Sequence, residues 1–434
     1  MYKLYFKQAW NLIRQERLFS LIYIGGTGLS VTMVMVLSII FYLKVASLYP
    51  ETNRNRMLVV KSGVVKKLKE KGYSSGQFSI QILESAFGGL KGIEAMAAVY
   101  EDYGSEYFIQ PEGRKEDIPV AVGFVNRDFW TVFSFHFLEG KPFTEADEQS
   151  GIKTAVISRS MATQLFGDEK AEGKYISLNF QQYRVCGVVE DVSQITPVSY
   201  AQLWVPYNTC PNYSAKSWES TGMLGRFRGY MLVEKGADIN QVKREAEESV
   251  ARIDHSMPDI TFSLMGQPDK FWQSIFRRYS SQPVDFTKIV LQYGLIFFML
   301  LFVPAVSLSG MADSRMERRL AEMGVRRAFG APVQSLMKQV LAENFVFTLL
   351  GGLFGLLLSY LIVFLSRNWI MQVLASGFSD GVQFEDVALA PSMLINIHVF
   401  VIALGVCFLL NLFSALIPAW RAAHRQIVLS LNAK

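Results

Sequence analysis

Long runs of apolar residues alternate along this chain with stretches in which apolar and polar positions mix. An α-helix that crosses the hydrocarbon core of a membrane, ~30 Å thick, needs about 20 apolar residues in succession. Four runs reach that length, and they predict transmembrane helices at 19–43, 289–311, 341–366 and 393–417. The first run is longer than the apolar region of a secretory signal and lacks a small-residue cleavage site. We therefore interpret it as an anchor that the protein keeps.

The segment 45–287 has a different pattern, in which short strand-like runs alternate with amphipathic helical stretches. A strand is predicted at 56–63, and the serines that open 74–90 are suited to cap a helix. Near the end of the segment, 230–253 is typical of a strand, a turn and a helix capped close to Asp238. This alternation predicts an α+β domain.

The order of these blocks predicts two lobes joined by a returning chain. Lobe one comprises about 50–118 and 225–280, and lobe two comprises about 119–220. The predicted fold class is therefore a membrane α-helical protein, with one transmembrane helix before and three after a large two-lobed α+β domain.

Positive charge gathers beside only some of the predicted membrane helix ends. Lys and Arg residues lie before the first helix, between the second and third, and in the tail 418–434, whereas the loop 367–392 offers only Arg367. Because positively charged loops remain in the cytoplasm, both termini and the loop 312–338 are predicted to be cytoplasmic. The domain 45–287 then lies on the far side of the membrane. The net charge of +5 follows from this topology and gives no reason to expect nucleic acid as a partner.

The leader 1–18 is itself amphipathic and is predicted to lie along the inner membrane face. Its apolar side chains, Trp10 and Ile13 among them, can embed in lipid, while Lys7, Arg14 and Arg17 can meet lipid phosphates.

A second amphipathic helix is predicted at 315–331, between the second and third membrane helices. Its arginines and glutamates form a polar face, while Met316, Leu320 and Met323 share one apolar stripe. Gly330, closely followed by a proline, provides a natural end. Two interpretations fit this composition: the helix rests on anionic lipid headgroups, or it serves only to determine the orientation of the chain in the membrane.

Charged side chains are nearly missing from the predicted membrane helices. Glu343 is the exception, and its position near the cytoplasmic end of the third helix favours hydration or pairing with a nearby arginine. Pro304 removes a backbone donor from the second helix and favours a kink or a hinge. Three glycines of the third helix would permit close helix approach, or would simply be tolerated in a membrane: Gly351, Gly352 and Gly355.

Signals for catalysis or for a bound cofactor are missing from the sequence. The four histidines are scattered without metal-site spacing, and His136, between two phenylalanines, is better explained by packing in a strand. The Gly-Lys pairs lack the spacing of a phosphate-binding loop. We therefore predict a chain that is not an enzyme and holds no cofactor. Cys186 and Cys210 could pair in an oxidising compartment, although burial of Cys186 in a strand is the better interpretation.

The stretch EMGVRRAFGA at 322–331, followed by QVLAEN, resembles the cytoplasmic loop and third-helix start of FtsX-like ABC transporter permeases. The C-terminal stretch ALIPAWRAAHRQIVLSL resembles the ending of that family, carried by Pro418, Ala419, Arg421 and Ala422. The blocks FHFLEGKPFTEAD, AVISRSMATQLFG and YRVCGVVEDV resemble the periplasmic core of the macrolide exporter MacB group. Together these motifs cover nearly the whole chain in the order of the family.

The resemblance implies that the loop 312–338 contains a coupling helix that docks on an ATPase. The residues that would form or approach this docking element are Arg315, Arg318, Arg319, Glu322, Gly324, Arg326, Arg327, Ala328 and Gly330. Glu343 matches a glutamate of the family. The fused members of the family carry an ATPase before the first membrane helix, so a separate ABC ATPase subunit is expected here, and that partner would bind ATP and Mg.

The resemblance also implies where the protein acts and with what. It implies a multi-pass protein of the bacterial inner membrane with a periplasmic domain, working as a homodimer or a paired permease. Mechanotransmission, in which ATP-driven motion is relayed to the periplasm, would serve export of drugs, peptides or envelope molecules, with a periplasmic adaptor and an outer-membrane channel. Two alternatives remain, an FtsX-type regulatory scaffold that activates a cell-wall hydrolase and a lipoprotein-release permease.

Overall fold

The computed structural model describes residues 11–300 with gaps, residues 332–370, and a few residues between them and in 400–412. The gaps before residue 300 are at 12, 16, 70, 103–104, 112–115, 211–212, 214–220 and 278–281. The described residues divide into two compact units. We call Leu43–Asp285 the sheet unit, and the described residues up to Tyr42 and from Phe286 onward the helical unit.

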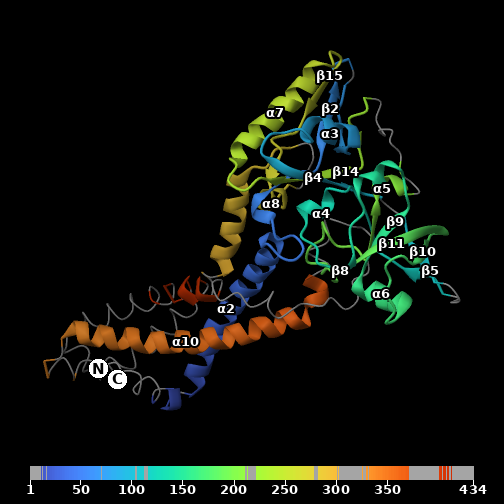
Figure 1. Ribbon diagram of the computed structural model, residues 1–434. Helices are drawn as coiled ribbons and strands as arrows, with labels where there is room; N and C mark the ends of the chain where they lie inside the picture. The colour runs from blue at the N-terminus through green and yellow to red at the C-terminus, as the bar shows by residue number, and fades with distance from the viewer. Residues whose placement is uncertain are drawn as a thin grey trace. The chain divides into compact units, whose positions relative to one another are not determined.

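Three apolar helices account for most of the described helical unit (Figure 1). They are α2 (Arg17–Val45), whose last residues belong to the sheet unit, a shorter helix at Phe286–Leu300, and α10 (Val333–Leu365). Of the described helices, α2 and the part of α10 from Met337 are long and apolar enough to cross a membrane. These two match the first and third predicted spans. Most of the fourth span and the second half of the second lie outside the described residues, so the count of four stays a prediction.

The first half of the sheet unit is built around the long strands β4 and β14, which pair antiparallel over nearly their whole length. β14 also pairs with β1, and β3 joins β14 to β2 and β15. The elements of this half are η1 (Arg54–Arg56), β1 (Met57–Val60), β2 (Gly63–Lys67), β3 (Ser74–Phe78), α3 (Ile80–Phe87), β4 (Ile93–Tyr100), β13 (Leu224–Gly225), β14 (Phe227–Val233), α7 (Ile239–His255), β15 (Ile260–Ser263), β16 (Asp269–Lys270) and α8 (Phe271–Ser274).

The second half continues the same hydrogen-bonded path through mixed strand directions. β11 runs parallel to β9 and β12 runs parallel to β7, while the remaining pairs are antiparallel. Its elements are β5 (Phe108–Gln110), β6 (Ile118–Pro119), β7 (Val122–Val125), α4 (Phe129–Val132), β8 (Phe137–Gly140), α5 (Glu145–Gln149), β9 (Thr154–Ser158), α6 (Arg159–Phe166), β10 (Tyr175–Leu178), β11 (Gln181–Val189), β12 (Leu203–Pro206) and η2 (Tyr207–Thr209).

A narrow seam joins the two halves where β4 meets β7. Only two residue pairs form this ladder, Val99 with Val125 and Tyr100 with Phe124. The side chain of Asn126 extends the join, because its Oδ1 accepts from the Ala98 amide at 2.9 Å and its Nδ2 donates to the Met96 carbonyl at 2.9 Å. A side chain thus takes the place of ladder hydrogen bonds beyond the last strand pair.

Two apolar clusters of buried residues hold the sheet unit together. The larger contains Phe78, Leu83 and Phe87 with the inner face of α7, and the smaller contains Phe129 and Trp204. Figure 1 shows α7 running beside α3 and β15, the elements that it contacts. The predicted α+β character is therefore what the described sheet unit has.

Local sequence explains where the main helices of this half begin. The Asp238 side chain accepts from the Asn240 amide at 2.9 Å and caps α7, as the sequence predicts. The serine cap of α3 is Ser79, and the prediction that placed it at the start of 74–90 was wrong. Ser74–Phe78 forms β3 instead, because pairing with β2 and β14 outweighs the local helix signal.

We expect Phe78→Ala to lower the free energy of unfolding of the sheet unit by about 3–5 kcal/mol, because it empties a fully buried ring site. The ring packs edge-on against Phe87 and Phe262, with centroid separations of 6.2 and 6.3 Å. Urea unfolding of the purified chain in detergent, followed by tryptophan fluorescence, measures the change. Phe180→Ala is the matched control, since Phe180 is 85% exposed and its loss should cost less than about 0.5 kcal/mol. Equal losses for both variants would contradict the assignment of the core.

Candidate functional site

Most residues that the sequence singled out in the second predicted membrane helix, in the predicted cytoplasmic loop and in the tail lie outside the described residues. They are Pro304, Arg315, Arg318, Arg319, Glu322, Gly324, Arg326, Arg327, Ala328, Pro418, Ala419, Arg421 and Ala422. The structure therefore leaves the predicted docking element as a prediction. Gly330 is described, and its φ of +86° is the left-handed conformation that favours glycine. It precedes Pro332, after which α10 begins.

Glu343 lies in the first half of α10, in a polar layer that includes Gln339, Asn344 and Tyr23 of α2. Its side chain was expected to be hydrated or paired with an arginine, but the residue is only 2% exposed, so the expectation of hydration was wrong. Gln339 Nε2 donates to Glu343 Oε1 at 3.1 Å. Next to it, Asn344 Oδ1 accepts from the Tyr23 hydroxyl of α2 at 3.4 Å. The polar groups of this layer therefore help to bind the two helices to each other.

The three glycines of α10 lie where neighbouring helices approach closely. A Cβ at Gly355 would lie 2.5 Å from the Gly28 carbonyl oxygen, and one at Gly351 would lie 2.8 Å from the Thr27 Cβ. The Thr32 hydroxyl also donates to the Gly355 carbonyl at 3.1 Å. A Cβ at Gly352 would clash with a side-chain carbon of Leu404. Of the two interpretations of these glycines, the structure supports close helix approach.

Gly355→Ala should force α2 and α10 apart and lower the stability of the helical unit by about 1–3 kcal/mol, because the new methyl group meets backbone. Thermal unfolding of the full chain in detergent measures this loss. Gly25→Ala in α2 is the control, since a Cβ there meets nothing within 4 Å. That substitution should be neutral or stabilising through helix propensity. If Gly355→Ala were as well tolerated as Gly25→Ala, the close contact would not exist in the folded protein.

The second place of interest is the C-terminal end of α2, within the sheet unit. The last carbonyls of a helix have no partner inside the helix. Here Arg54 reaches back to them, and its Nη1 donates to the carbonyls of Leu43 at 3.3 Å, Lys44 at 3.3 Å and Ala46 at 2.6 Å. A single guanidinium thus attaches the end of the membrane helix to the first turn of the sheet unit.

Glu51 completes this attachment. Its Oε2 lies 2.8 Å from Arg54 Nε, and its Oε1 accepts from the Ser199 amide at 3.1 Å and from the Ser199 hydroxyl at 2.9 Å. Neither side chain of the ion pair exceeds 2% exposure. The Arg54 guanidinium also lies over the Phe271 ring of α8, 4.6 Å from its centroid. We call Glu51, Arg54, Ser199 and Phe271 the α2 anchor.

Sequence reasoning missed the α2 anchor. Glu51 and Arg54 stand in the stretch PETNRNR, which follows a membrane run and has the composition of a solvated loop. The signal that could have found them is the i,i+3 spacing of opposite charges directly after the helix end. That spacing alone occurs in many exposed loops, so only the folded neighbours Ser199 and Phe271 reveal the burial.

The structure also describes His136 and the two cysteines that the sequence singled out. His136 was expected to be packed in a strand, but this was wrong, because it precedes β8 and its side chain is 69% exposed beside Glu190. Cys186 lies in β11, where it donates to the Ala155 carbonyl, and burial raises the pKa of its thiol to about 12. Both Cys186 and Cys210 are free thiols.

In the part of the chain that the structure describes, no group of three or more His, Cys, Asp or Glu side chains could hold a metal ion. The polar side chains of the α2 anchor attach one segment of the chain to another.

Comparison with known proteins identifies the class. A model of the MacB-like periplasmic core domain matches residues 20–249, and a model of the FtsX-like permease C-terminal domain matches residues 294–427. The chain therefore belongs to the FtsX-like permeases with a MacB-like periplasmic core domain. It is an ABC transporter permease of this type.

Individual relatives are distant. The chain is 25% identical over 277 residues to the uncharacterized ABC transporter permease YknZ of Bacillus subtilis, covering 64% of this chain and 65% of that protein. It is 25% identical over 309 residues to the macrolide export ATP-binding/permease protein MacB of Pasteurella multocida, covering 71% of this chain but only 42% of that protein. The crystal structure of the periplasmic region of MacB from Actinobacillus actinomycetemcomitans aligns with a TM-score of 0.35 at 16% identity, over 50% of this chain and 94% of that one.

Arg54→Ala should lower the free energy of unfolding of the sheet unit by about 3–5 kcal/mol, because it leaves the buried Glu51 carboxylate without its arginine. The double variant Glu51→Leu with Arg54→Leu should lose less, since it removes both buried charges together. Urea unfolding in detergent measures both changes.

Lys69→Ala is the control for the α2 anchor, because its ion pair with Asp259 is formed by side chains that are 82% and 70% exposed. Its cost should stay below about 1 kcal/mol. A similar loss for Lys69→Ala and Arg54→Ala would contradict the buried character of the anchor.

Proposed function

We propose that this chain is the permease subunit that converts ATP hydrolysis by a separate ATPase subunit into movement of its own periplasmic domain. The movement serves export of drugs, peptides or envelope molecules, and the cargo does not pass between the membrane helices. The MacB relatives are named macrolide export proteins, which supports an export role. The chain spans 65% of the first relative and about two-fifths of the MacB proteins, so their whole activity enters here as a proposal.

The α2 anchor is the observation that carries this proposal. α2 is one helix from Arg17 to Val45, and its terminal carbonyls are bound directly by a buried arginine. A flexible linker would absorb a displacement of the helix end, whereas a buried ion pair with five further hydrogen bonds of defined geometry would pass it on to the sheet unit. An attachment of this kind suits a subunit whose task is to relay motion.

The composition of the described membrane helices supports the same proposal. α2 and α10 are apolar along most of their length and pack through glycines and a few hydrogen-bonded polar groups. A hydrophilic cargo that entered between such helices would lose its hydration without replacement. Helices that approach closely through small residues are suited to move as stiff rods.

We further propose that the arginine-rich segment 315–330 is the coupling helix that receives the ATPase, and that two copies of the chain, or two paired permeases, work together. An adaptor and an outer-membrane channel would complete the export route. Capture of partners with the tagged chain tests this extension. An adaptor in the captured material supports export, and a peptidoglycan hydrolase would instead support a regulatory scaffold.

Arg326→Glu with Arg327→Glu should lower stimulation of the partner ATPase about tenfold or more, because two reversed charges at the docking surface oppose association. ATP hydrolysis by the reconstituted complex in vesicles is the measurement, with membrane insertion checked separately. The control reverses two exposed lysines of the sheet unit, Lys66→Glu with Lys69→Glu, which makes the same change in net charge. Unchanged stimulation in the arginine variant would place the docking surface elsewhere.

A further inference from the structure

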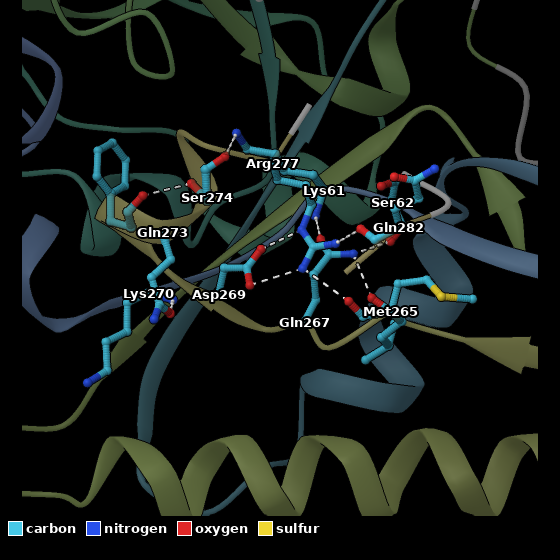
Figure 2. Close-up of polar contacts among 12 residues, drawn as sticks. Lys61, Ser62, Met265, Gln267, Asp269, Lys270, Gln273, Ser274, Arg277 and Gln282 are labelled. Atoms are coloured by element: carbon cyan, nitrogen blue, oxygen red, sulfur yellow. Dashed lines mark hydrogen bonds and ion pairs between the residues drawn. The ribbon is translucent and has the colours of Figure 1, made fainter. Parts of the chain in front are cut away.

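A buried polar cluster ties the segment after β15 to strand β1 (Figure 2). We call it the Arg277 clamp, and its members are Lys61, Ser62, Gln267, Asp269, Ser274 and Arg277. It lies wholly within the sheet unit. The chain leaves this cluster, passes Gln282, and begins the apolar helix Phe286–Leu300.

The centre of the clamp is a two-pronged ion pair. Arg277 Nε lies 2.5 Å from Asp269 Oδ2, and Arg277 Nη2 lies 3.1 Å from Asp269 Oδ1. The two side chains are 3% and 4% exposed. Bidentate pairs of this kind fix orientation as well as distance. Since Asp269 of β16 stands opposite Val59 of β1, the pair fixes Arg277 to the sheet itself.

The remaining donors of Arg277 form hydrogen bonds with carbonyls of the neighbouring backbone. Nη2 also donates to the Met265 carbonyl at 3.2 Å, and Nη1 donates to the Gln282 carbonyl at 2.9 Å. Met265 lies before β16, whereas Gln282 lies beyond α8 and shortly before the apolar helix. One guanidinium therefore holds the chain on both sides of α8, as Figure 2 shows.

Gln267 and Lys61 form the other side of the clamp. Gln267 Oε1 accepts from the Lys61 amide at 2.7 Å, and Gln267 Nε2 donates to the Ser62 carbonyl at 2.5 Å. The Lys61 ammonium donates to the Ser274 carbonyl at the end of α8 at 2.7 Å. Burial, with Arg228 and Arg277 nearby, lowers the pKa of Lys61 to about 7, against the opposing effect of Asp269 and Glu101. The Lys61 side chain, which directly follows β1, thus attaches the end of α8 to that strand.

We propose that Asp269 and Arg277 are positioning residues for transport, through which the connection to the second membrane helix moves the sheet. This inference rests on the proposed relay of motion. It adds that the Arg277 clamp receives the motion where the chain leads to the second membrane helix. A buried ion pair often gives no more stability than apolar residues of the same volume. Here the ion pair fixes the orientation of the segment that leads to the helix relative to strand β1.

The two membrane connections also meet through α8. Phe271 begins α8 and lies under the Arg54 guanidinium of the α2 anchor, while Ser274 ends α8 and accepts from Lys61 of the clamp. Displacement of either connection therefore acts on the same short helix. The clamp gives the second connection the kind of buried arginine attachment that Arg54 gives the first.

The test uses the full chain in complex with its ATPase in lipid nanodiscs. Hydrogen exchange is measured in peptides covering β1, β14 and 264–277, with and without ATP and vanadate. We expect the wild-type complex to change its exchange on ATP binding, and Asp269→Asn and Arg277→Lys to lose that change in β1 and β14. Both variants should still bind the ATPase and hydrolyse ATP. Asp269→Arg with Arg277→Asp should restore part of the change.

Asp102→Asn is the matched control, because Asp102 is also a buried carboxylate paired with an arginine, Arg226, at 3.0 Å in the same unit. It should keep the ATP-dependent change, since it lies outside the clamp. If the clamp variants keep the change as Asp102→Asn does, the clamp is only structural and this inference fails alone. If the wild-type complex shows no change in the sheet unit, the relay of motion fails and the inference fails with it. Should Asp269→Asn not fold, Arg277→Lys, which keeps the charge, decides the outcome.

Discussion

The last carbonyls of a membrane helix need hydrogen-bond partners where that helix enters a folded domain, and the rest of this structure depends on how that need is met. At the end of α2 this is done by Arg54, and a buried arginine in turn requires the Glu51 carboxylate. The carboxylate requires its own donors, which Ser199 supplies. Each of these groups needs the next as its partner. Removing any one of them therefore leaves a buried charge without a full set of hydrogen bonds.

The same solution is repeated where the chain leaves the sheet unit. Arg277 satisfies backbone carbonyls on both sides of α8 and is balanced by Asp269. A permease that only anchored a periplasmic domain could use a flexible tether at either connection. Two buried arginine attachments, both in contact with α8, instead fix the positions of the two connections relative to the sheet.

Much of the fold follows from local pattern. The apolar runs predicted α2 and α10, and Asp238 marked the start of α7, because a side-chain cap and an apolar run are properties of neighbouring residues. Predictions that required distant partners were weaker. Ser74 was assigned to a helix start although β3 forms there by pairing with β2, and His136 was assigned to a strand although it is exposed. The glycines of α10 were found, but their contact with α2 required the folded structure to choose between two interpretations.

The α2 anchor and the Arg277 clamp lay beyond the reach of sequence reasoning for the same physical reason. Glu51 and Ser199 are separated by most of the sheet unit in sequence, and Lys61 and Ser274 even more so. Charges in such positions look like solvated loop residues until burial is known. The strand ladder between β4 and β7 is only two residue pairs long, yet both apolar clusters contain residues from each side of it. Buried side chains, more than backbone hydrogen bonds, therefore join the two halves of the sheet unit into one body.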